Sequence, residues 1–450
     1  MRNLWLFPLL FLFQASPGFA QLTFPEVDRE TYRFYLNQEW DSLLTLGKEA
    51  LKHDIDYFYL RVRMGTARYE KGQYILATEQ YRKARNFNGA DSYTNASLYY
   101  SLLASNRPSE AYALTATFPE ELKKEVGFQR RILDLLSLEL GYTLSDAYRK
   151  SDPRALMGPD SIYGQQDLYG DSYYGYLQGT LNVSKRVSLT VGYSYLNFRK
   201  RKLFQFTTAA QTRNPSFDYH LTQHEAHLGS SIRLVDGFRI EPAIHLVFGS
   251  STNISAAYIL QEEDYRIRQQ DTSFINMVAS LMLTKDFGIL SAGLFGSWSN
   301  LNDRTQVQAG ISLTYYPLGN LSFYGNTMLF ALMESGNGRV IILQMLGVKV
   351  TKWLWAEGDF LFGNIANGNL GNGLIVYNNS DRVRFRAGGS LIFPLFRQLD
   401  LALVYQFFER ESEIRFFVNG TDGTREVVVQ QTRVMKYQTN SVFLGLKWKL

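Results

Sequence analysis

The sequence predicts a mainly β chain, an antiparallel transmembrane β-barrel of about fourteen strands preceded by a small all-α helical domain. Three observations predict it. Apolar and polar residues alternate with a period of two from residue 132 onward, which places them on opposite faces of strands. Aromatic residues make up 15% of the chain while its mean hydropathy is only −0.20, as expected when half of every strand faces a wet lumen. Short connections also alternate with mostly long ones, as in outer-membrane barrels.

The clearest alternation is a hairpin at 174–198. Leu177, Leu181, Val191 and Tyr193 share one face, and polar residues occupy the other. Each arm has roughly the ten residues that a tilted strand needs to cross a bilayer. The strands are expected near 132–144, 174–184, 187–198, 218–233, 238–249, 271–284, 288–299, 303–316, 321–333, 339–351, 354–364, 382–393, 399–411 and 434–450.

Connection lengths predict the orientation of the barrel. Short turns are expected at 185–186, 235–237, 285–287, 317–319, 351–352 and 396–398, and long external loops at 145–173, 199–217, 250–270, 365–381 and 412–433. Short turns of such barrels face the periplasm, so the helical domain before the first strand should lie there too. The last strand carries Val442, Leu444, Leu446, Trp448 and Leu450 on one face. It resembles the terminal strand that outer-membrane assembly machinery recognises, with Leu450 in place of the usual Phe.

Composition limits the other classes of protein. The chain contains no cysteine, which excludes a disulfide framework, a thiolate metal site and a lipoprotein anchor. Its net charge of +5 comes without a long basic run, so a nucleic-acid partner is not expected. Residues 1–20 combine Arg2, an apolar core and a small-x-small cleavage pattern, as in a secretory signal peptide. No cofactor is expected.

The domain at 21–131 shows helical periodicity and an internal repeat of 34 residues. Its clearest unit, 58–89, resembles a tetratricopeptide repeat, with the family's spacing at Gly65, Tyr69, Gly72, Tyr74, Ala77, Tyr81 and Ala84. Small residues at these positions let two helices approach, Gly72 closes the turn, and the tyrosines fill the remaining space. These residues are structural rather than ligand-binding. The resemblance implies a groove that binds a periplasmic protein partner; a purely structural spacer is the alternative.

Charged residues on two late strands predict a charged stripe in the lumen of the barrel at 132–450. Alternation puts Arg382, Arg384 and Arg386 on the inward face of one strand, beside Glu357 and Asp359 of the preceding strand. Such a stripe could bias the passage of solutes through a transverse field. The alternative, given equal weight, is that these groups pair and stiffen the wall.

Two histidines are expected to meet in the lumen. Pairing across the 235–237 turn puts His227 almost opposite His245, near Glu225 and Glu241. A polar wall contact without a metal is the favoured interpretation. Ser230 and Ser231 lie near His227, but no acidic residue stands in an evident order to orient the histidine of a catalytic triad. The chain contains neither Gly-x-Ser-x-Gly nor His-Glu-x-x-His. We therefore expect no enzyme activity.

A basic and aromatic stretch is expected to form an external loop base. It contains Arg199, Lys200, Arg201 and Lys202, followed by Phe204 and Phe206. Guanidinium and ammonium groups bind phosphates, so this loop could contact lipopolysaccharide. A solvated loop without a ligand is the alternative.

In layout, the chain resembles the YaiO-like family of outer-membrane barrels and, in shortened form, the repeat-plus-barrel exporters of bacterial exopolysaccharides. The resemblance implies an outer-membrane pore or a secretion component whose periplasmic repeats recruit a protein partner. The alternative is a non-transporting scaffold in envelope assembly or secretion, and the third possibility is a barrel hydrolase acting on lipid. No site residue carries over from these families.

Overall fold

A computed structural model describes residues 22–129, 131–150, 161–208, 211–234, 237–421 and 426–450. The chain forms two compact units, divided between Ser101 and Leu102. The predicted signal peptide lies outside the described residues. No helix in the described part is long and apolar enough to cross a membrane.

The first unit consists of helices, and the first three of them share one apolar core. The helices are α1 (Phe24–Leu36), α2 (Trp40–Lys52), α3 (Phe58–Glu70), α4 (Tyr74–Phe87) and α5 (Ser92–Ala104), which ends just past the boundary. Residues three and four apart on α1, α2 and α3 face inward and are almost completely buried, as amphipathic helices require. They are Val27, Leu43, Leu44, Ala50, Leu60, Met64 and Ala67.

The pair α3–α4 is packed through the residues singled out in the sequence. Gly65 lies directly under the Tyr81 ring, and Tyr81 is 2% exposed. Gly72 has φ +68° in the turn between the helices, a conformation that favours glycine. Ala77 and Ala84 are fully buried on α4, and the rings of Tyr69 and Tyr74 meet edge to face with their centroids 5.1 Å apart. Helix pairing follows from small residues facing a bulky one.

In the second unit, a short helical segment precedes the barrel. It contains α6 (Pro108–Leu114), the 3-10 turn η1 (Thr115–Thr117) and α7 (Glu120–Glu125). Arg107, just before α6, pairs with Glu110 at 2.6 Å and with Asp286 of the barrel. Asp286 also accepts a hydrogen bond from Ser291. This charge network ties the segment before α6 to the barrel. The turn predicted at 285–287 is strand instead, because these residues pair with β8, and the chain turns at Gly288 and Ile289.

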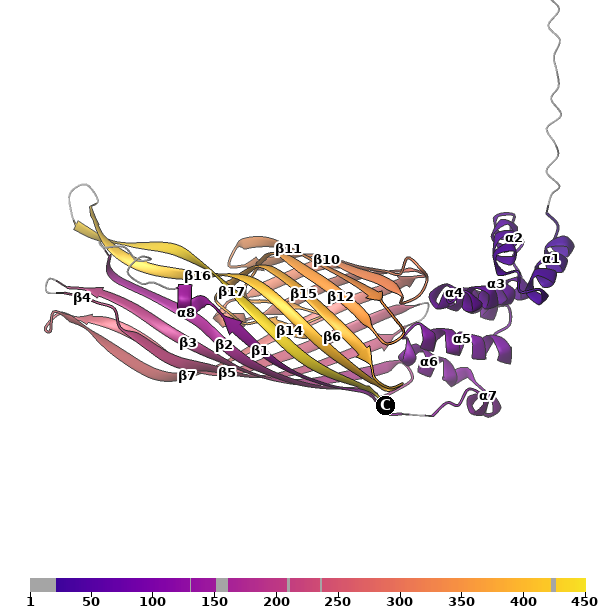
Figure 1. The fold of residues 1–450 in the computed structure, drawn as a ribbon, viewed down its shortest axis with the longest axis horizontal. Helices are drawn as coiled ribbons and strands as arrows, with labels where there is room; N and C mark the ends of the chain where they lie inside the picture. The colour runs from indigo at the N-terminus through magenta and orange to yellow at the C-terminus, as the bar shows by residue number, and fades with distance from the viewer. Residues whose placement is uncertain (1–21, 130, 151–160, 209–210, 235–236, 422–425) are drawn as a thin grey trace, which may run out of the picture. The chain divides into compact units, whose positions relative to one another are not determined.

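The rest of the second unit is a closed antiparallel barrel of 14 strands, as predicted (Figure 1). Seven short strands have 10–13 residues: β1 (Leu133–Ser145), β8 (Leu290–Ser299), β9 (Gln306–Tyr315), β10 (Phe323–Glu334), β11 (Asn337–Lys349), β12 (Trp355–Ile365) and β15 (Arg382–Pro394). Seven long strands have 18–24 residues: β2 (Ser161–Asn182), β3 (Val187–Thr207), β5 (Ser216–Arg233), β6 (Phe238–Ile259), β7 (Asp264–Phe287), β16 (Leu399–Thr421) and β17 (Glu426–Lys449). A two-residue strand β4 (Thr212–Arg213) pairs with β3.

The first and last strands close the barrel. Leu135 pairs with Lys449, and the register continues to Ser145 opposite Thr439. Neighbouring strands otherwise pair in chain order, each with the next. The backbone polar groups of β1 and β17 thereby find partners, and no open edge is left between the first and the last strand.

The two faces of the hairpin at 174–198 are as predicted. Leu177, Val191 and Tyr193 are about half exposed on the outside, whereas Ser188 and Ser194 are buried inside. The same outward row of apolar side chains runs around the barrel, for example Leu140, Leu294, Ile311, Val340, Phe362 and Leu444. Inside, the wall is mainly polar.

The long strands continue beyond the short ones at the end of the barrel opposite Leu450, where the sequence predicted loops. Above the end of β1, Ile414 to Val418 of β16 pair directly with β2, so this extension curls over on itself. Aromatic rings fill it: Phe206 stacks on Tyr265 at 4.5 Å, and Tyr163 lies 5.6 Å from Tyr265. Continued alternation with aromatic residues favours strand over loop here.

The predicted basic loop is therefore part of β3. Lys200 and Lys202 point inward with Phe204 and Phe206; Lys200 lies over the Tyr169 ring, and Lys202 pairs with Asp167 at 2.7 Å. Arg201 on the other face pairs with Asp218. The prediction of an exposed basic rim is wrong because the strand alternation continues through it.

The substitution Gly65→Ala should destabilise the helical unit. Its methyl group would stand 2.7 Å from Tyr81 Cε1. Overpacking of this kind costs about 1–3 kcal/mol, against about 1 kcal/mol gained from the helix propensity of alanine. Thermal unfolding, followed by the helical circular dichroism signal, should shift to lower temperature. The control is Gly89→Ala, where the nearest atom, the Arg85 carbonyl oxygen, lies 3.4 Å away; equal shifts in both variants would contradict this account of the packing.

Candidate functional site

The segment 366–381, called here the inner hairpin, folds into the barrel instead of forming the external loop that the sequence predicted. It contains the paired strands β13 (Gly368–Leu370) and β14 (Ile375–Tyr377). Gly371, Asn372 and Gly373 all have positive φ in the tight turn between them. Asn and Gly tolerate this conformation, which is why the sequence Asn-Gly-Asn-Leu-Gly-Asn-Gly can reverse direction in so little space.

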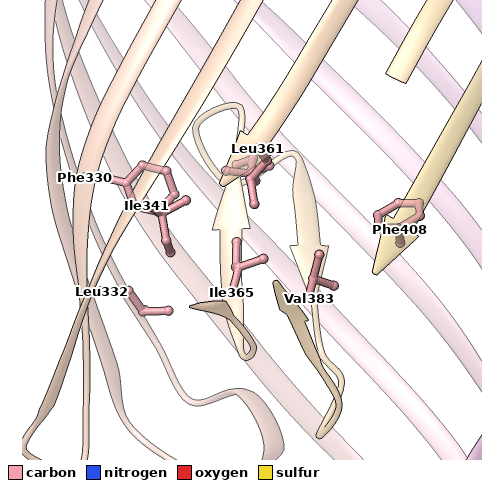
Figure 2. Packing of buried hydrophobic residues seen from close by; sticks show 8 residues of the cluster. Phe330, Leu332, Ile341, Leu361, Ile365, Val383 and Phe408 are labelled. Atoms are coloured by element: carbon pink, nitrogen blue, oxygen red, sulfur yellow. The ribbon is translucent and has the colours of Figure 1, made fainter. Parts of the chain in front are cut away.

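One side of the inner hairpin packs on an apolar patch of the barrel wall. Leu370 is 2% exposed and belongs to the same cluster as Phe330, Leu332, Ile341, Leu361, Ile365, Val383 and Phe408. Figure 2 shows that these wall side chains, from β10, β11, β12, β15 and β16, point into the interior around the two small strands. An inward apolar patch in a wet lumen has to be covered, and the inner hairpin covers it.

Asparagine side chains hold the inner hairpin to the wall. The amide of Asn369 donates to Ser297 (2.9 Å) and Gln308 (3.0 Å), and its backbone N–H donates to Gln308 (2.8 Å). The amide of Asn367 donates to Glu334 at 2.7 Å. These bonds reach three neighbouring strands, β8, β9 and β10, so the segment is fixed across the wall.

The turn and the second arm are held in the same way. The amide of Asn372 donates to the carbonyl of Glu241 at 2.7 Å, and Ser280 donates to the Asn372 carbonyl at 2.9 Å. The amide of Asn378 donates to Asn276 at 3.1 Å. The inner hairpin thus bonds to β6 and β7 as well and spans the lumen.

Two cavities border the inner hairpin. The rim cavity, of about 590 Å³, lies toward the end opposite Leu450 and is lined by polar residues that include Gln165, Asn302, Glu334, Arg339, Asn367 and Asp381. The lumen cavity, of about 230 Å³, is lined by residues 374–379 and by side chains of β1, β2, β3, β5, β15, β16 and β17. The same segment lines both, so a solute moving from one to the other meets the inner hairpin.

The three arginines predicted as a lumen stripe do not share one face. A bulge between Val383 and Phe385 shifts the register of β15. Val383 points inward, and Arg384 is exposed and pairs with Glu411 at 2.9 Å. Arg382 pairs with Glu413 and lines the rim cavity. Only Arg386 of the three faces the lumen cavity, because sequence alternation cannot show a bulge.

The two acidic residues of β12 bond to separate partners. Asp359 pairs with Arg386 at 2.5 Å. Glu357 accepts hydrogen bonds from the hydroxyls of Tyr324 and Ser390. Each of the five charged residues predicted as a lumen stripe thus bonds to a residue of the wall, and of these five Arg386 also lines the lumen cavity and Arg382 the rim cavity.

His227 and His245 lie opposite each other in the strand register, with ring centroids 5.8 Å apart and both rings buried. Nε2 of His245 lies 3.3 Å from the Glu225 carboxylate, and Glu225 accepts a hydrogen bond from Ser194. No group of three metal-ligating side chains exists among the described residues. Among the described residues, no serine hydroxyl hydrogen-bonds to either histidine ring.

No protein-family model matches this chain, and no curated protein matches it. Solved structures of barrels do. A FadL homologue of Pseudomonas aeruginosa is 10% identical over 70% of this chain and 90% of its own, with a TM-score of 0.41. The toluene transporter TodX of P. putida is 9% identical over 78% of this chain and 94% of its own (TM-score 0.33). The outer membrane protein Omp33 of Acinetobacter baumannii is 7% identical over 71% of this chain and 100% of its own (TM-score 0.33). The likeness is one of fold.

The substitution Asn369→Ala should loosen the inner hairpin. Asn369 is fully buried, and its loss leaves Gln308 and Ser297 without their partner, at a cost of about 1–3 kcal/mol. The chain has no cysteine, so Leu370→Cys supplies a single thiol on the buried side. Its rate of maleimide modification should rise about tenfold or more when Asn369→Ala is added. The exposed Asn253→Ala is the matched control, and an equal rate in both variants would show that the amide bonds do not hold the segment.

Proposed function

We propose that this protein is an outer-membrane pore or secretion component whose lumen is closed at rest by the inner hairpin. Its helical domain faces the periplasm and recruits a protein partner. The observation that carries the proposal is the inner hairpin itself, a segment fixed across a polar lumen mainly by side-chain hydrogen bonds.

The outer surface supports the membrane location. The short strands, which have 10–13 residues, cross the apolar band of this surface, and this is about the length that a strand needs to cross a bilayer. Exposed Tyr142 and Tyr173 mark one border of the band, and Trp353, Phe396 and Trp448 mark the other. Aromatic side chains at both borders suit the two lipid interfaces, so membrane lipid and lipopolysaccharide are the expected neighbours.

The chemistry of the contacts favours a segment that can leave. Gln308, Ser297, Ser280, Asn276 and Glu334 all bond to the inner hairpin, and water can replace each of these partners. Without the inner hairpin, these groups would line an aqueous path from the lumen cavity to the rim cavity. Wall residues chosen only to pack a permanent core would be apolar.

The turns support the orientation. The connections at the end that carries Leu450 are short, and the helical domain enters β1 at that end. In outer-membrane barrels such turns face the periplasm. We therefore place the helical domain in the periplasm.

The helical unit offers an aromatic surface for a protein partner. Tyr32 of α1 and Tyr59 of α3 are about half exposed and flank Arg63, whose guanidinium lies 5.1 and 5.8 Å from the two rings. Tyr93 of α5 bonds to Thr66 beside them. Tyrosine and arginine are enriched where proteins bind one another. A surface of this kind on three adjacent helices suits an extended peptide segment.

A second function, a non-transporting scaffold, is favoured by one observation. Leu370 packs into an apolar cluster of the wall, as a permanent filling would. In that case the inner hairpin never leaves, the barrel is an anchor, and the helical unit performs the function.

Conductance in planar bilayers distinguishes the two functions. Ile365 and Val383 are paired, so residues 366–380 can be replaced by a short Gly-Ser turn without stretching the wall. The transport proposal predicts little current from the wild type and a large, steady current from this variant. A folded variant that conducts no better than the wild type would leave the scaffold as the function.

Photo-crosslinking in cells tests the recruitment of a partner. A photoreactive residue replacing Tyr59 should cross-link to one defined periplasmic protein, because the aromatic surface lies around this position. The same residue at Asn86, exposed on α4, should not. Equal products from both positions, or none from Tyr59, would remove the recruitment role.

A further inference from the structure

The lumen cavity presents an apolar surface where a barrel interior is expected to be polar. Leu374, Ile375 and Val376 of the inner hairpin line it, and Ile375 is 47% exposed. Phe408 of β16 and Phe443 of β17 line the same space. An exposed apolar surface facing a cavity indicates a place that an apolar group occupies.

One end of this cavity is cationic. Arg386 is 6% exposed, bonds to Asp359 and the Tyr377 hydroxyl, and has a buried Nε without a partner among the described residues. Arg410 also lines the cavity; its Nε donates to Thr439 at 3.2 Å and its guanidinium lies 4.9 Å from the Phe408 ring. Arg410 makes no ion pair within the described residues. Asp381, the acid that acts on it electrostatically, accepts a hydrogen bond from Tyr437.

The acidic groups of the cavity lie far from these arginines. Glu139 and Glu225 also line the cavity, and the strand registers connect them through Tyr176 and Ser194, so the two acids lie level with each other across β1, β2, β3 and β5. The strand registers put Arg410 opposite Tyr437 and Glu139 opposite Gly445. The separation of Tyr437 and Gly445 along β17 is roughly 25 Å at the rise of a strand. Phe443 lies between them, so the cavity runs from a cationic end over an apolar middle to an acidic end.

We propose that the lumen cavity binds a small single-chain amphiphile with an anionic headgroup. The headgroup lies at Arg386 and Arg410, where charge-assisted hydrogen bonds hold it. The tail lies along Leu374–Val376 and the rings of Phe408 and Phe443. The volume of about 230 Å³ corresponds to roughly eight water molecules, which suits a short tail. The inference rests on the proposed transport function, for which it names the class of solute.

An amphiphile bound in the lumen cavity is in contact with the inner hairpin. Its apolar contacts are made by the segment that closes the lumen, and Tyr377 connects the same segment to Arg386. A bound amphiphile therefore contacts both the wall and the closing segment.

Titration of the full-length protein in lipid nanodiscs with octanoate tests the site, with heat of binding as the readout. Octanoate should bind saturably, and octylamine, with the same tail and a cationic head, should bind at least tenfold more weakly. Arg410→Gln should weaken octanoate binding at least tenfold. Arg268→Gln, an exposed arginine on the long-strand extension, should leave it unchanged.

The second variant is Ile375→Ser, which changes the inner hairpin and leaves the wall intact. It should also weaken the binding of octanoate. Absence of saturable binding, or equal binding by the Arg410→Gln and Arg268→Gln variants, would overturn the proposal. Saturable octanoate binding without any conductance on removal of the inner hairpin would support the site and remove transport. Conductance without octanoate binding would support transport and overturn this class of solute.

Discussion

The rest of the structure depends on one constraint, the need to pair the backbone polar groups along the two edges of a long sheet. The last strand meets this need by returning to the first, and β17 pairs with β1 along eleven registered positions from Leu135 to Ser145. Closure of 14 strands then encloses a space that wall side chains alone do not fill. The inner hairpin occupies part of this space.

Unequal strand lengths give the barrel two different sides. The short strands end near the rim cavity, whereas the long strands continue and curl until β16 pairs with β2. Stacked rings such as Phe206 and Tyr265 fill the curled part, so it forms an apolar core of its own. The rim cavity lies where the short strands β10 and β11 end, and Ala366 and Asn367 of the inner hairpin line it. The position of this cavity thus follows from where the short strands stop.

Much of the fold could be predicted from the sequence because alternation is a local property. All fourteen strands were expected at the right places, and the pairing of His227 with His245 followed from counting across one turn. The lengths of the long strands are underestimated from the sequence, because stretches such as 199–207 alternate but carry the charged residues that are typical of loops. The bulge between Val383 and Phe385 could not be predicted from the sequence for a different reason. One extra residue in the strand changes the face on which Arg384 lies and leaves the composition of the strand unchanged.

The site itself could not be predicted. The repeated Asn-Gly pairs of 367–373 indicate tight turns, and in retrospect they were the available signal. Whether such a segment turns outward or inward depends on its partners, Gln308, Ser297, Ser280 and Asn276, which belong to three other strands and share no pattern with it in the sequence. The cavity beside it depends on that direction in turn.

A disulfide between the inner hairpin and the wall tests the central claim most directly. A Cβ atom at Gly373 lies 3.7 Å from Cβ of Ser280, within the range of about 3.5–4.5 Å that a disulfide needs. In a chain without cysteine, the double variant Gly373→Cys/Ser280→Cys should therefore cross-link on mild oxidation in the membrane. The pair Gly336→Cys/Ser280→Cys, with the same positive φ at the glycine but in the turn between β10 and β11, should not. Two thiols that stay free in the first pair, or that cross-link no faster than those of the second, would contradict a hairpin held inside the lumen.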